Sequence, residues 1–317
     1  MPRCSVIIVT YNSAAAIEGC LCALASQNCE IVVVDNASQD DTVEHVRTVA
    51  HSLPLQLIKI SHNIGFAGGV DHGARATNSD VLVLLNPDAV AEPGAIDAVL
   101  ACFAATGASA VGGALLTSDG KPDEGFAFRR LPTLASLVFE ALLINQLWPD
   151  NLVNWHYRCL GADYSRRQQV EQPAGACLAV RREAWDSLGG MDTDFYPVWF
   201  EDVDFCARLL SSGGTIFYCP EARFRHSGAH SVGKLEFGDK QLFWYRNMVR
   251  YATKHCSTVS VLVLRISIIV GMGLRMLASL FGSGPDGVAT GNAIRGYLRV
   301  GLWAIGLDKA PSASDVK

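Results

Sequence analysis

The stretch Val81-Leu-Val-Leu-Leu-Asn-Pro-Asp88 joins five consecutive apolar residues to a polar turn. A short apolar run of this kind is typical of a strand that is buried on both faces of a sheet. Pro87 fixes the backbone of the turn, so Asn86 and Asp88 place an amide and a carboxylate just beyond the strand. Because ligands of parallel sheets bind outside the carboxyl ends of the strands, the residues that follow each strand matter most.

The same pattern recurs along the first 113 residues. Further runs rich in β-branched residues predict strands at residues 6–10, 31–35, 55–60 and 108–112. The segments between them predict helices at residues 14–26, 41–50, 68–76 and 94–105. This alternation indicates an α/β, Rossmann-like fold, in which helices cover both faces of a mostly parallel sheet.

Polar side chains follow four of the expected strands. Thr10-Tyr11-Asn12 follows the first, Asp35-Asn36-Ala37-Ser38 the second, His62-Asn63-Ile64-Gly65 the third and Asn86-Pro87-Asp88 the fourth. Each of these turns alone is explained by the preference of Asn, Asp and Ser for turns and caps. Four such turns at one edge are better explained by a ligand.

Composition limits the remaining choices. Half of the 317 residues are hydrophobic, and the net charge of −5 argues against broad nucleic-acid binding, which needs a basic face. The ten cysteines include no CxxC pair, so we expect reduced thiols rather than a zinc or redox motif. The chain runs almost directly into its first strand without the pattern of a signal peptide, so we expect the catalytic part to be cytoplasmic.

The second half of the chain departs from the alternation. Residues 114–172 are expected to be an irregular insert, with helices near 182, at 201–211 and at 239–255, and a strand at 215–219. We expect one α/β domain over residues 1–238, divided at 113 into two halves. A helical region over 239–308 and a disordered tail over 309–317 follow it.

Residues 258–281 form a long apolar segment that contains Arg265 and Arg275. Its length suits a membrane span, but the two charges favour an interfacial amphipathic helix or buried core helices. Contact with membrane, core or a second subunit in a homodimer is left open by the sequence.

Two acidic clusters are able to carry chemistry. A carboxylate at Asp88, beside the amide of Asn86, suits a hard cation such as Mg²⁺ or Mn²⁺, although a helix cap is the alternative. Glu201-Asp202-Val203-Asp204 follows two aromatic residues, and partial burial of neighbouring carboxylates makes a general base credible. The alternative is a helix first turn, where acids are favoured by the helix dipole.

Six stretches, read in order, resemble glycosyltransferase family 2. They begin at Val6-Ile-Ile-Val-Thr-Tyr-Asn12 and continue with Ile31-Val-Val-Val-Asp-Asn-Ala-Ser38, Asn63-Ile-Gly-Phe-Ala-Gly-Gly69, Leu84-Leu-Asn-Pro-Asp88, Gly175-Ala-Cys-Leu-Ala-Val-Arg-Arg182 and Trp199-Phe-Glu-Asp-Val-Asp-Phe205. The resemblance covers residues 3–255 and implies the GT-A fold, with a catalytic domain over residues 1–238 that has a nucleotide-sugar-binding half over 1–113 and an acceptor-binding half over 114–238. Many members carry Asp-x-Asp where this chain has Asn-Pro-Asp, a form common in the bacterial rhamnosyltransferase-like branch.

The resemblance implies a role for each matching position. The residues that would bind the nucleotide sugar are Thr10, Tyr11, Asn12, Asp35, Asn63, Gly69 and Asn86. Asp88 and His226 would hold the metal, although His226 alone is more often structural. Asp202 would be the general base with Glu201 beside it, and Trp199 and Asp204 would contact the acceptor.

These roles describe an inverting, metal-assisted hexosyltransferase. The donor would be a dTDP- or UDP-sugar, with dTDP-rhamnose favoured by the branch. The acceptor would be lipid-linked or a polysaccharide of the cell surface, reached at the inner face of the cell membrane. The alternatives are a nucleotidyltransferase, which lacks support because no basic glycine-rich loop follows the first strand, and a non-catalytic nucleotide-sugar-binding protein.

Overall fold

The computed structural model describes residues 3–226, 228 and 235–308. The chain divides into two compact units. The sheet unit comprises Met1–Leu131, Arg158–Asp194 and Glu201–Gly233, and the helical unit comprises Pro132–Tyr157, Phe195–Phe200 and Lys234–Lys317. The expected tail over 309–317 lies outside the described residues.

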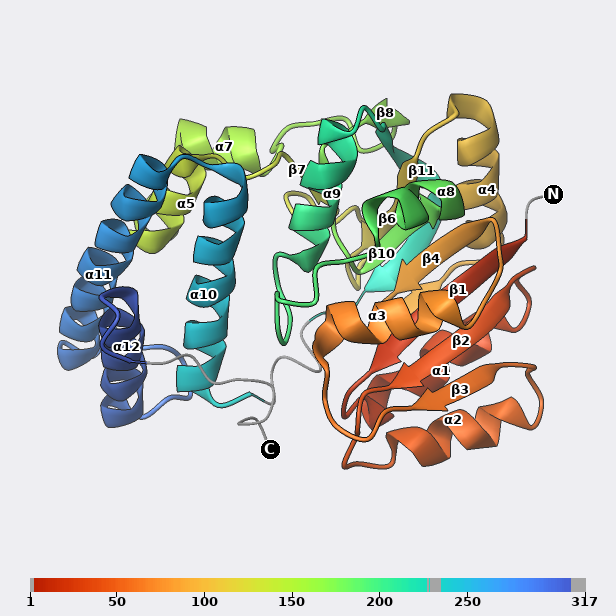
Figure 1. Cartoon of the computed structure of the whole chain (residues 1–317), viewed down its shortest axis with the longest axis horizontal. Helices are drawn as coiled ribbons and strands as arrows, with labels where there is room; N and C mark the ends of the chain where they lie inside the picture. The colour runs from red at the N-terminus through yellow and green to blue at the C-terminus, as the bar shows by residue number, and fades with distance from the viewer. Residues whose placement is uncertain (1–2, 227, 229–234, 309–317) are drawn as a thin grey trace. The chain divides into compact units, whose positions relative to one another are not determined.

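The sheet unit is built on one mixed sheet in the order β3-β2-β1-β4-β10-β6-β11-β5 (Figure 1). Its strands are β1 (Cys4–Thr10), β2 (Glu30–Asp35), β3 (Gln56–Lys59), β4 (Val81–Leu85), β5 (Ala89–Ala91), β6 (Ala110–Leu116), β10 (Cys177–Arg181) and β11 (Ile216–His226), with β8 (Gln168–Gln169) paired to β11. A small second sheet pairs β7 (Phe128–Arg129) with β9 (Gln172–Pro173).

Strands β3, β2, β1 and β4 run parallel, as the sequence predicts. Every residue of β1 and β4 is buried, which explains why these strands are continuous apolar runs. Strand β10 lies antiparallel between β4 and β6, whereas β6 and β11 are parallel. The predicted α/β fold with a mostly parallel sheet is therefore confirmed. Strand β10 is reversed at the centre of the sheet, and β5 and β8 run antiparallel to β11.

Helices cover the sheet. They are α1 (Ala14–Leu24), α2 (Thr42–Ala50), α3 (Gly65–Arg75), α4 (Ala95–Thr106), α8 (Arg182–Leu188) and α9 (Glu201–Ser211). Figure 1 shows α3 and α8 in front of the strands. Helix α3 approaches β1 closely at Gly69, where the absence of a side chain makes room. A Cβ at this position would lie 2.6 Å from Cγ1 of Val9.

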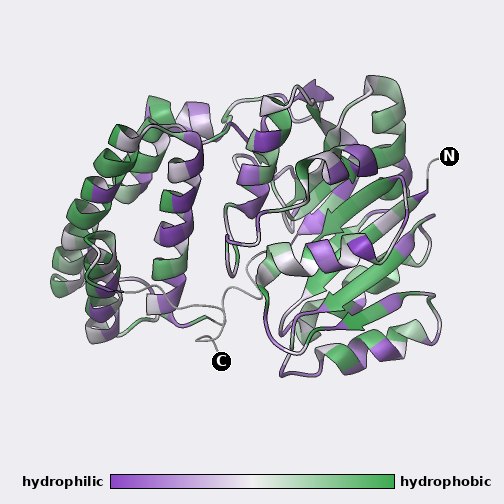
Figure 2. Cartoon of the chain, viewed as in Figure 1, coloured by the Kyte–Doolittle hydropathy of each residue, from purple (hydrophilic) through white to green (hydrophobic). Residues whose placement is uncertain are grey.

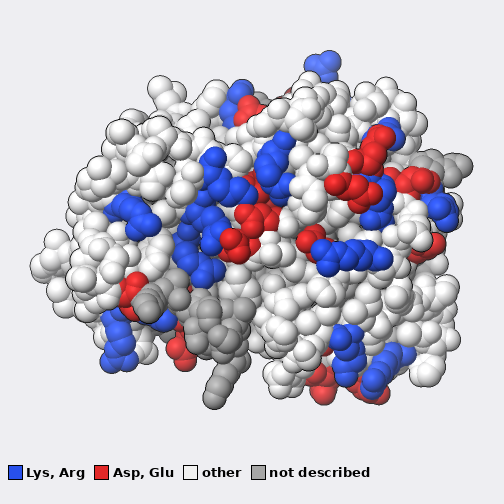
Figure 3. All heavy atoms as spheres, viewed as in Figure 1, with Lys and Arg blue, Asp and Glu red and all other residues white. Residues whose placement is uncertain are grey.

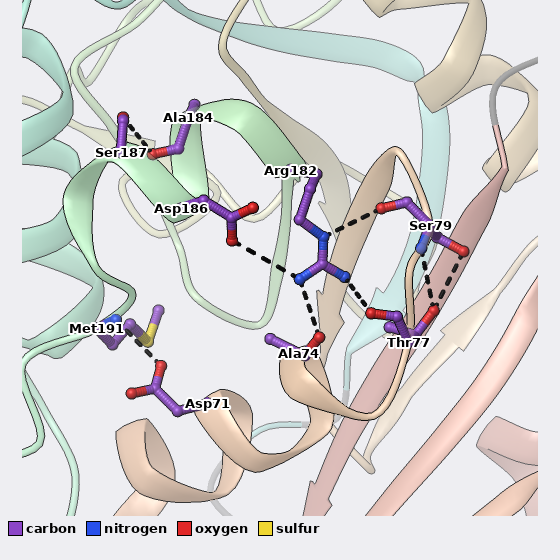
Figure 4. A network of polar contacts seen from close by, with 9 residues as sticks. All are labelled: Asp71, Ala74, Thr77, Ser79, Arg182, Ala184, Asp186, Ser187 and Met191. Carbon is purple, nitrogen blue, oxygen red and sulfur yellow. Dashed lines mark hydrogen bonds and ion pairs between the residues drawn. The ribbon is translucent and has the colours of Figure 1, made fainter.

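Arg182, at the start of α8, joins this helix to the turn that follows α3 (Figure 4). Its guanidinium donates hydrogen bonds to the carbonyl oxygens of Ala74, Thr77 and Ser79 at 2.8–3.2 Å. These carbonyls lie after the last turn of α3 or just within it, where no further helical N–H reaches them. One planar cation therefore satisfies three acceptors of the turn that leads into β4.

The helical unit contains α5 (Leu134–Ala141), α6 (Ile144–Leu147), α7 (Leu152–Tyr157), α10 (Phe237–His255), α11 (Thr258–Leu280) and α12 (Thr290–Ala304). The expectation of an irregular insert was wrong for residues 134–157, which contain three short helices. A capping box of Thr133 and Ser136 starts α5. Arg275 of α11 donates to the carbonyl oxygen of Ala141 at 2.6 Å, which joins this segment to the C-terminal helices.

Helix α11 buries polar as well as apolar residues and exposes many large apolar side chains. Its buried face includes Ser267, Arg275 and Ser279, and the two serine hydroxyls bond to carbonyls of their own helix. Its exposed apolar side chains include Val259, Leu262, Val263, Ile266, Ile269, Val270, Leu274, Leu277 and Leu280. This helix is long and apolar enough to cross a membrane, and Figure 2 shows it as mostly hydrophobic.

Candidate active site

The carboxyl ends of β1 and β2 hold a connected set of polar groups. The Thr10 hydroxyl donates to Oδ1 of Asp35 at 3.1 Å, and the N–H of Ser38 donates to Oδ2 at 3.2 Å. Asn12, with a φ of 52°, accepts from the N–H of Gln39 and donates its own N–H to the Ser38 hydroxyl. The two loops are thereby held together at the edge where the sequence predicts nucleotide binding.

Asn63 reaches the same edge from the loop after β3. Its side-chain oxygen accepts from the Asn36 amide at 2.9 Å and from the N–H of Gly65 at 2.9 Å. Asn36 also accepts from the N–H of Ile64 at 2.8 Å. The structure thus brings the loops after β1, β2 and β3 together, and Asn36 and Ser38 make the hydrogen bonds that join them.

Asp88 and His226 meet beside the turn after β4. Nε2 of His226 lies 3.4 Å from Oδ1 of Asp88, and both side chains are buried. Phe126 stacks on the imidazole with ring centroids 5.5 Å apart and an interplanar angle of 4°, which fixes the ring. The imidazole nitrogen is buried with no hydrogen-bond partner among the described residues.

A nitrogen and a carboxylate oxygen of this kind fit a divalent cation. Two protein ligands leave the remaining positions for substrate oxygens and water, as is usual for magnesium and manganese. Within the described part of the chain, no group of three or more His, Cys, Asp or Glu side chains is placed to hold a metal. A cation here would therefore depend on the ligands that a diphosphate supplies.

Asp202 lies at the first turn of α9 and is held by backbone N–H groups. Its Oδ2 accepts from the N–H of Gly175 at 2.8 Å and from the Gln172 amide at 3.3 Å. A Cβ at Gly175 would lie 3.0 Å from that oxygen, so a larger residue there would push against the carboxylate. Burial raises the pKa of Asp202, and the N–H donors and the Arg129 guanidinium oppose the rise.

Glu201 precedes this carboxylate and is almost fully buried. Its Oε2 has no hydrogen-bond partner among the residues that the structure describes. Burial, and then the neighbouring Asp202, hold the pKa of Glu201 well above its usual range. The two acids therefore differ in character, because Glu201 favours its neutral form and Asp202 is supported by donors.

Comparison with known sequences identifies the family. The profile described as "Glycosyl transferase family 2" matches residues 5–188, over half of the chain, and one described as "N-terminal domain of galactosyltransferase" matches residues 156–230. The chain belongs to glycosyltransferase family 2. The protein is a glycosyltransferase, and this membership disfavours the nucleotidyltransferase and the non-catalytic binding protein.

Two curated relatives of the glycosyltransferase are rhamnosyltransferases. The N-acetylglucosaminyl-diphospho-decaprenol L-rhamnosyltransferase of Mycobacterium tuberculosis is 29% identical over 72% of this chain and 77% of its own. The O-antigen chain rhamnosyltransferase WbaN of Salmonella anatum is 26% identical over 72% of this chain and 67% of its own.

A solved structure supports the GT-A fold of the glycosyltransferase. The mannosyltransferase PcManGT from Pyrobaculum calidifontis, in complex with GDP-Man and Mn²⁺, superposes with a TM-score of 0.55 at 18% identity. The match covers 96% of this chain and 85% of that chain. The rhamnosyltransferase-like branch and the GT-A fold expected from the sequence are confirmed.

Three expected site residues of the glycosyltransferase have other contacts. Gly69 packs against Val9. Asp204 is fully buried and pairs with Arg208 at 2.8 Å. Trp199 belongs to the helical unit and meets Trp244 edge-on at 5.5 Å. Their assignments to donor and acceptor stay predictions.

Sequence reasoning missed Phe126, Gln172 and Gly175 as partners of the site. Gly175 belongs to one of the motifs quoted above, but no role was assigned to it. A glycine at this point of a motif could have indicated a close approach of another group. Gln172 and Phe126 gave no local signal, because each reaches its partner from a segment that is distant in sequence.

Proposed function

We propose that this glycosyltransferase is an inverting enzyme that transfers rhamnose from dTDP-rhamnose to a hydroxyl of a lipid-linked or polysaccharide acceptor. The names of the two rhamnosyltransferase relatives support the sugar, and the first of them supports a lipid-linked acceptor. UDP-linked sugars are the alternative donors. The donor would bind at Thr10, Tyr11, Asn12, Asp35, Asn63 and Asn86.

The observation that carries the mechanism is the Asp202 carboxylate, held by backbone N–H groups in the same unit as the polar sheet edge. In the proposal, Asp202 takes the proton of the acceptor hydroxyl as that oxygen attacks the anomeric carbon. The nucleoside diphosphate leaves from the opposite face, so a single displacement inverts the anomeric centre. The raised pKa of Asp202 moves it toward neutral pH, where a general base is most effective.

Asp88 and His226 are the proposed holders of Mg²⁺ or Mn²⁺. When bound, such a cation neutralises the charge that develops on the leaving diphosphate. The buried Nε2 of His226 supports this role, because it makes no hydrogen bond among the described residues and lies 3.4 Å from Oδ1 of Asp88, where both atoms could bind one cation. The complex of PcManGT with GDP-Man and Mn²⁺ supports it by similarity of fold.

We further propose that the enzyme works in the cytoplasm at the inner face of the cell membrane. The exposed apolar side chains of α11 support contact with a lipid surface. A homodimer through the same surface is the competing proposal.

The test uses the purified full-length enzyme with Mg²⁺ or Mn²⁺ and a panel of dTDP- and UDP-sugars. We expect donor binding and slow donor hydrolysis, and EDTA should weaken donor binding. Asp202→Asn should keep donor binding but lower turnover by about 10²–10⁴-fold, the usual contribution of a general base. Absence of both binding and hydrolysis for every donor would refute sugar transfer, and donor binding that EDTA leaves unchanged would refute the metal.

A further inference from the structure

The helical unit contains a cavity of about 540 Å³ within its own elements. Its walls come from α5 and α6, from α10, from α11 and the loop that follows it, and from α12. Trp199, Trp244 and Tyr245 contribute aromatic surface, and Lys240 and Arg275 contribute positive charge. The proposed transfer chemistry in the sheet unit uses none of these five residues as base or metal ligand.

Arg275 is a buried cation without an acidic partner in the described part of the chain. The residue is 8% exposed, and its guanidinium donates to the carbonyl oxygens of Glu140, Ala141 and Gly271. Among the described residues, no carboxylate lies within 4.0 Å of it or of the Lys240 ammonium. Burial of a positive charge is costly without an anion nearby, so the cavity favours an anionic ligand.

Two acids, Glu140 and Asp286, also line the cavity, and among the described residues neither makes an ion pair with these cations. The Glu140 carboxylate accepts from the Asn145 amide at 3.3 Å, and Asp286 is exposed on the loop after α11. Tyr245 lies under the Arg275 guanidinium at 5.7 Å from its ring centroid, which holds the cation in place. The guanidinium of Arg275 therefore packs against the aromatic ring of Tyr245.

The backbone at the aromatic wall is strained. Trp199 has a φ of 78°, in the left-handed region that bulky residues rarely adopt. The segment before it is held by the buried side-chain amide of Asn247, which donates to the carbonyl oxygens of Tyr196 and Val198. Strain of this kind is retained where it places a side chain for binding.

The cavity is continuous with exposed apolar surface. Leu147 lines the cavity and is 83% exposed, and Trp148 beside it is 61% exposed. Helix α11 gives Arg275 and Ala278 to the cavity and exposes the apolar side chains described above. In Figure 3 the left edge of the surface, where α11 lies in Figure 1, carries few charged atoms.

We propose that this cavity binds the polyprenyl diphosphate portion of a lipid-linked acceptor, an assignment that rests on the proposed function. The diphosphate would lie between Lys240 and Arg275, and the prenyl chain would leave along Leu147 and Trp148. A nucleotide has no apolar chain to cover these exposed residues, and a neutral lipid has no charge to pair with Arg275. A prenyl diphosphate matches both the buried cation and the apolar exit.

Binding of geranylgeranyl diphosphate to the full-length protein tests the assignment. We expect saturable binding, measured by isothermal titration calorimetry, that is at least tenfold tighter than binding of inorganic diphosphate or of geranylgeraniol. Lys240→Ala should weaken it about tenfold through loss of the positive charge, and among the described residues the Lys240 side chain makes no hydrogen bond or ion pair whose loss would disturb the fold. Arg295→Ala is the matched control, since Arg295 is an exposed cation of α12 outside the cavity, and its binding should stay unchanged.

Trp244→Ala provides a second variant, with circular dichroism to confirm folding. The assignment is overturned if Lys240→Ala and Trp244→Ala both bind as the unchanged protein does, or if geranylgeraniol binds as tightly as its diphosphate. Donor hydrolysis by the unchanged protein is measured in parallel. Loss of hydrolysis with intact prenyl diphosphate binding counts against the proposed function alone, and the reverse result counts against the cavity alone.

Discussion

At the scale of single residues, burial raises the pKa of both adjacent acids at the start of α9, and each leads to a prediction of its own. Burial holds the pKa of Glu201 well above its usual range, so the folded protein keeps a proton there that the unfolded chain releases above about pH 4.3. Stability is therefore lost as pH rises from that value toward the folded pKa, by about 1.4 kcal/mol per pH unit from this group.

Glu201→Gln removes that loss, because glutamine has the shape of the neutral acid and cannot ionise. We expect the melting temperature of Glu201→Gln to fall less steeply between pH 6 and 9 than that of the unchanged protein. Differential scanning calorimetry across this range measures the difference. Parallel slopes in the two proteins would show that Glu201 is already ionised in the fold.

Gln172 is predicted to position Asp202 and to favour its charged form. Its amide donates to Oδ2 of Asp202 at 3.3 Å, and loss of a donor to a carboxylate raises the pKa of that carboxylate. Gln172→Ala should move the rising limb of the pH–rate profile to higher pH, because the charged form of Asp202 loses a hydrogen-bond donor. Turnover should recover at alkaline pH, whereas Asp202→Asn should stay inactive throughout. A uniform decrease without a shift would assign Gln172 to packing alone.

At the scale of elements, the contact of α3 with β1 depends on the absence of a side chain at Gly69. A Cβ there would lie 2.6 Å from Cγ1 of Val9, so Gly69→Ala should destabilise the protein by about 1–3 kcal/mol. Adding Val9→Ala should restore part of the loss, measured by urea denaturation. Gly19→Ala in α1 is the control, because nothing lies within 4 Å of its Cβ position. That control should stabilise by about 0.5–1 kcal/mol, and an equal loss in both variants would exclude the steric explanation.

Most elements of the sheet unit could be predicted from the sequence, because fully buried strands are short apolar runs between polar turns. The expected strand at 81–85 and helix at 201–211 have the observed limits. The direction of β10 could not be predicted, since an apolar run reads the same in either direction. Residues 134–157 were missed because their helices are short and depend on contacts such as that of Ala141 with Arg275.

The candidate site could be predicted in part for a similar reason. Asp88 and Asp202 stand beside recognisable motifs, and their contacts with His226 and Gly175 follow from the fold. The sequence indicated an apolar segment at 258–281 with two arginines, and it did not indicate which face would be buried. Tertiary contacts determine which face is buried, because α11 is apolar on most of its circumference. Arg275 donates to carbonyl oxygens of another helix, α5, which the sequence of α11 does not reveal.

At the scale of the whole molecule, the exposed apolar side chains of α11 predict binding to lipid vesicles. The triple variant Leu262→Ser, Ile266→Ser and Val270→Ser changes exposed side chains only, so it should keep the melting temperature within a few degrees. Its partition into vesicles should fall at least tenfold, because each large apolar side chain contributes about 1.5–3 kcal/mol when buried. Flotation assays measure the partition.

The control for this variant is the buried face of the same helix. Ile268→Ser introduces one hydroxyl at a fully buried position and should lower stability by several kcal/mol. Vesicle binding by the triple variant equal to that of the unchanged protein would show that α11 does not contact lipid. Analytical ultracentrifugation of both proteins then tests the competing homodimer.

The central position of β10 has a consequence for how the chain is synthesised and folds. Strand β10 joins β4 to β6 in the sheet, yet it follows both of them in the sequence. A nascent chain that ends before Cys177 is able to pair β3, β2, β1 and β4, but β6 has no neighbour through which to join them. Closure of the sheet therefore waits for the ribosome to release the Cys177–Arg181 segment. Such non-local pairing makes folding slow and leaves apolar strand edges open to other chains in the meantime.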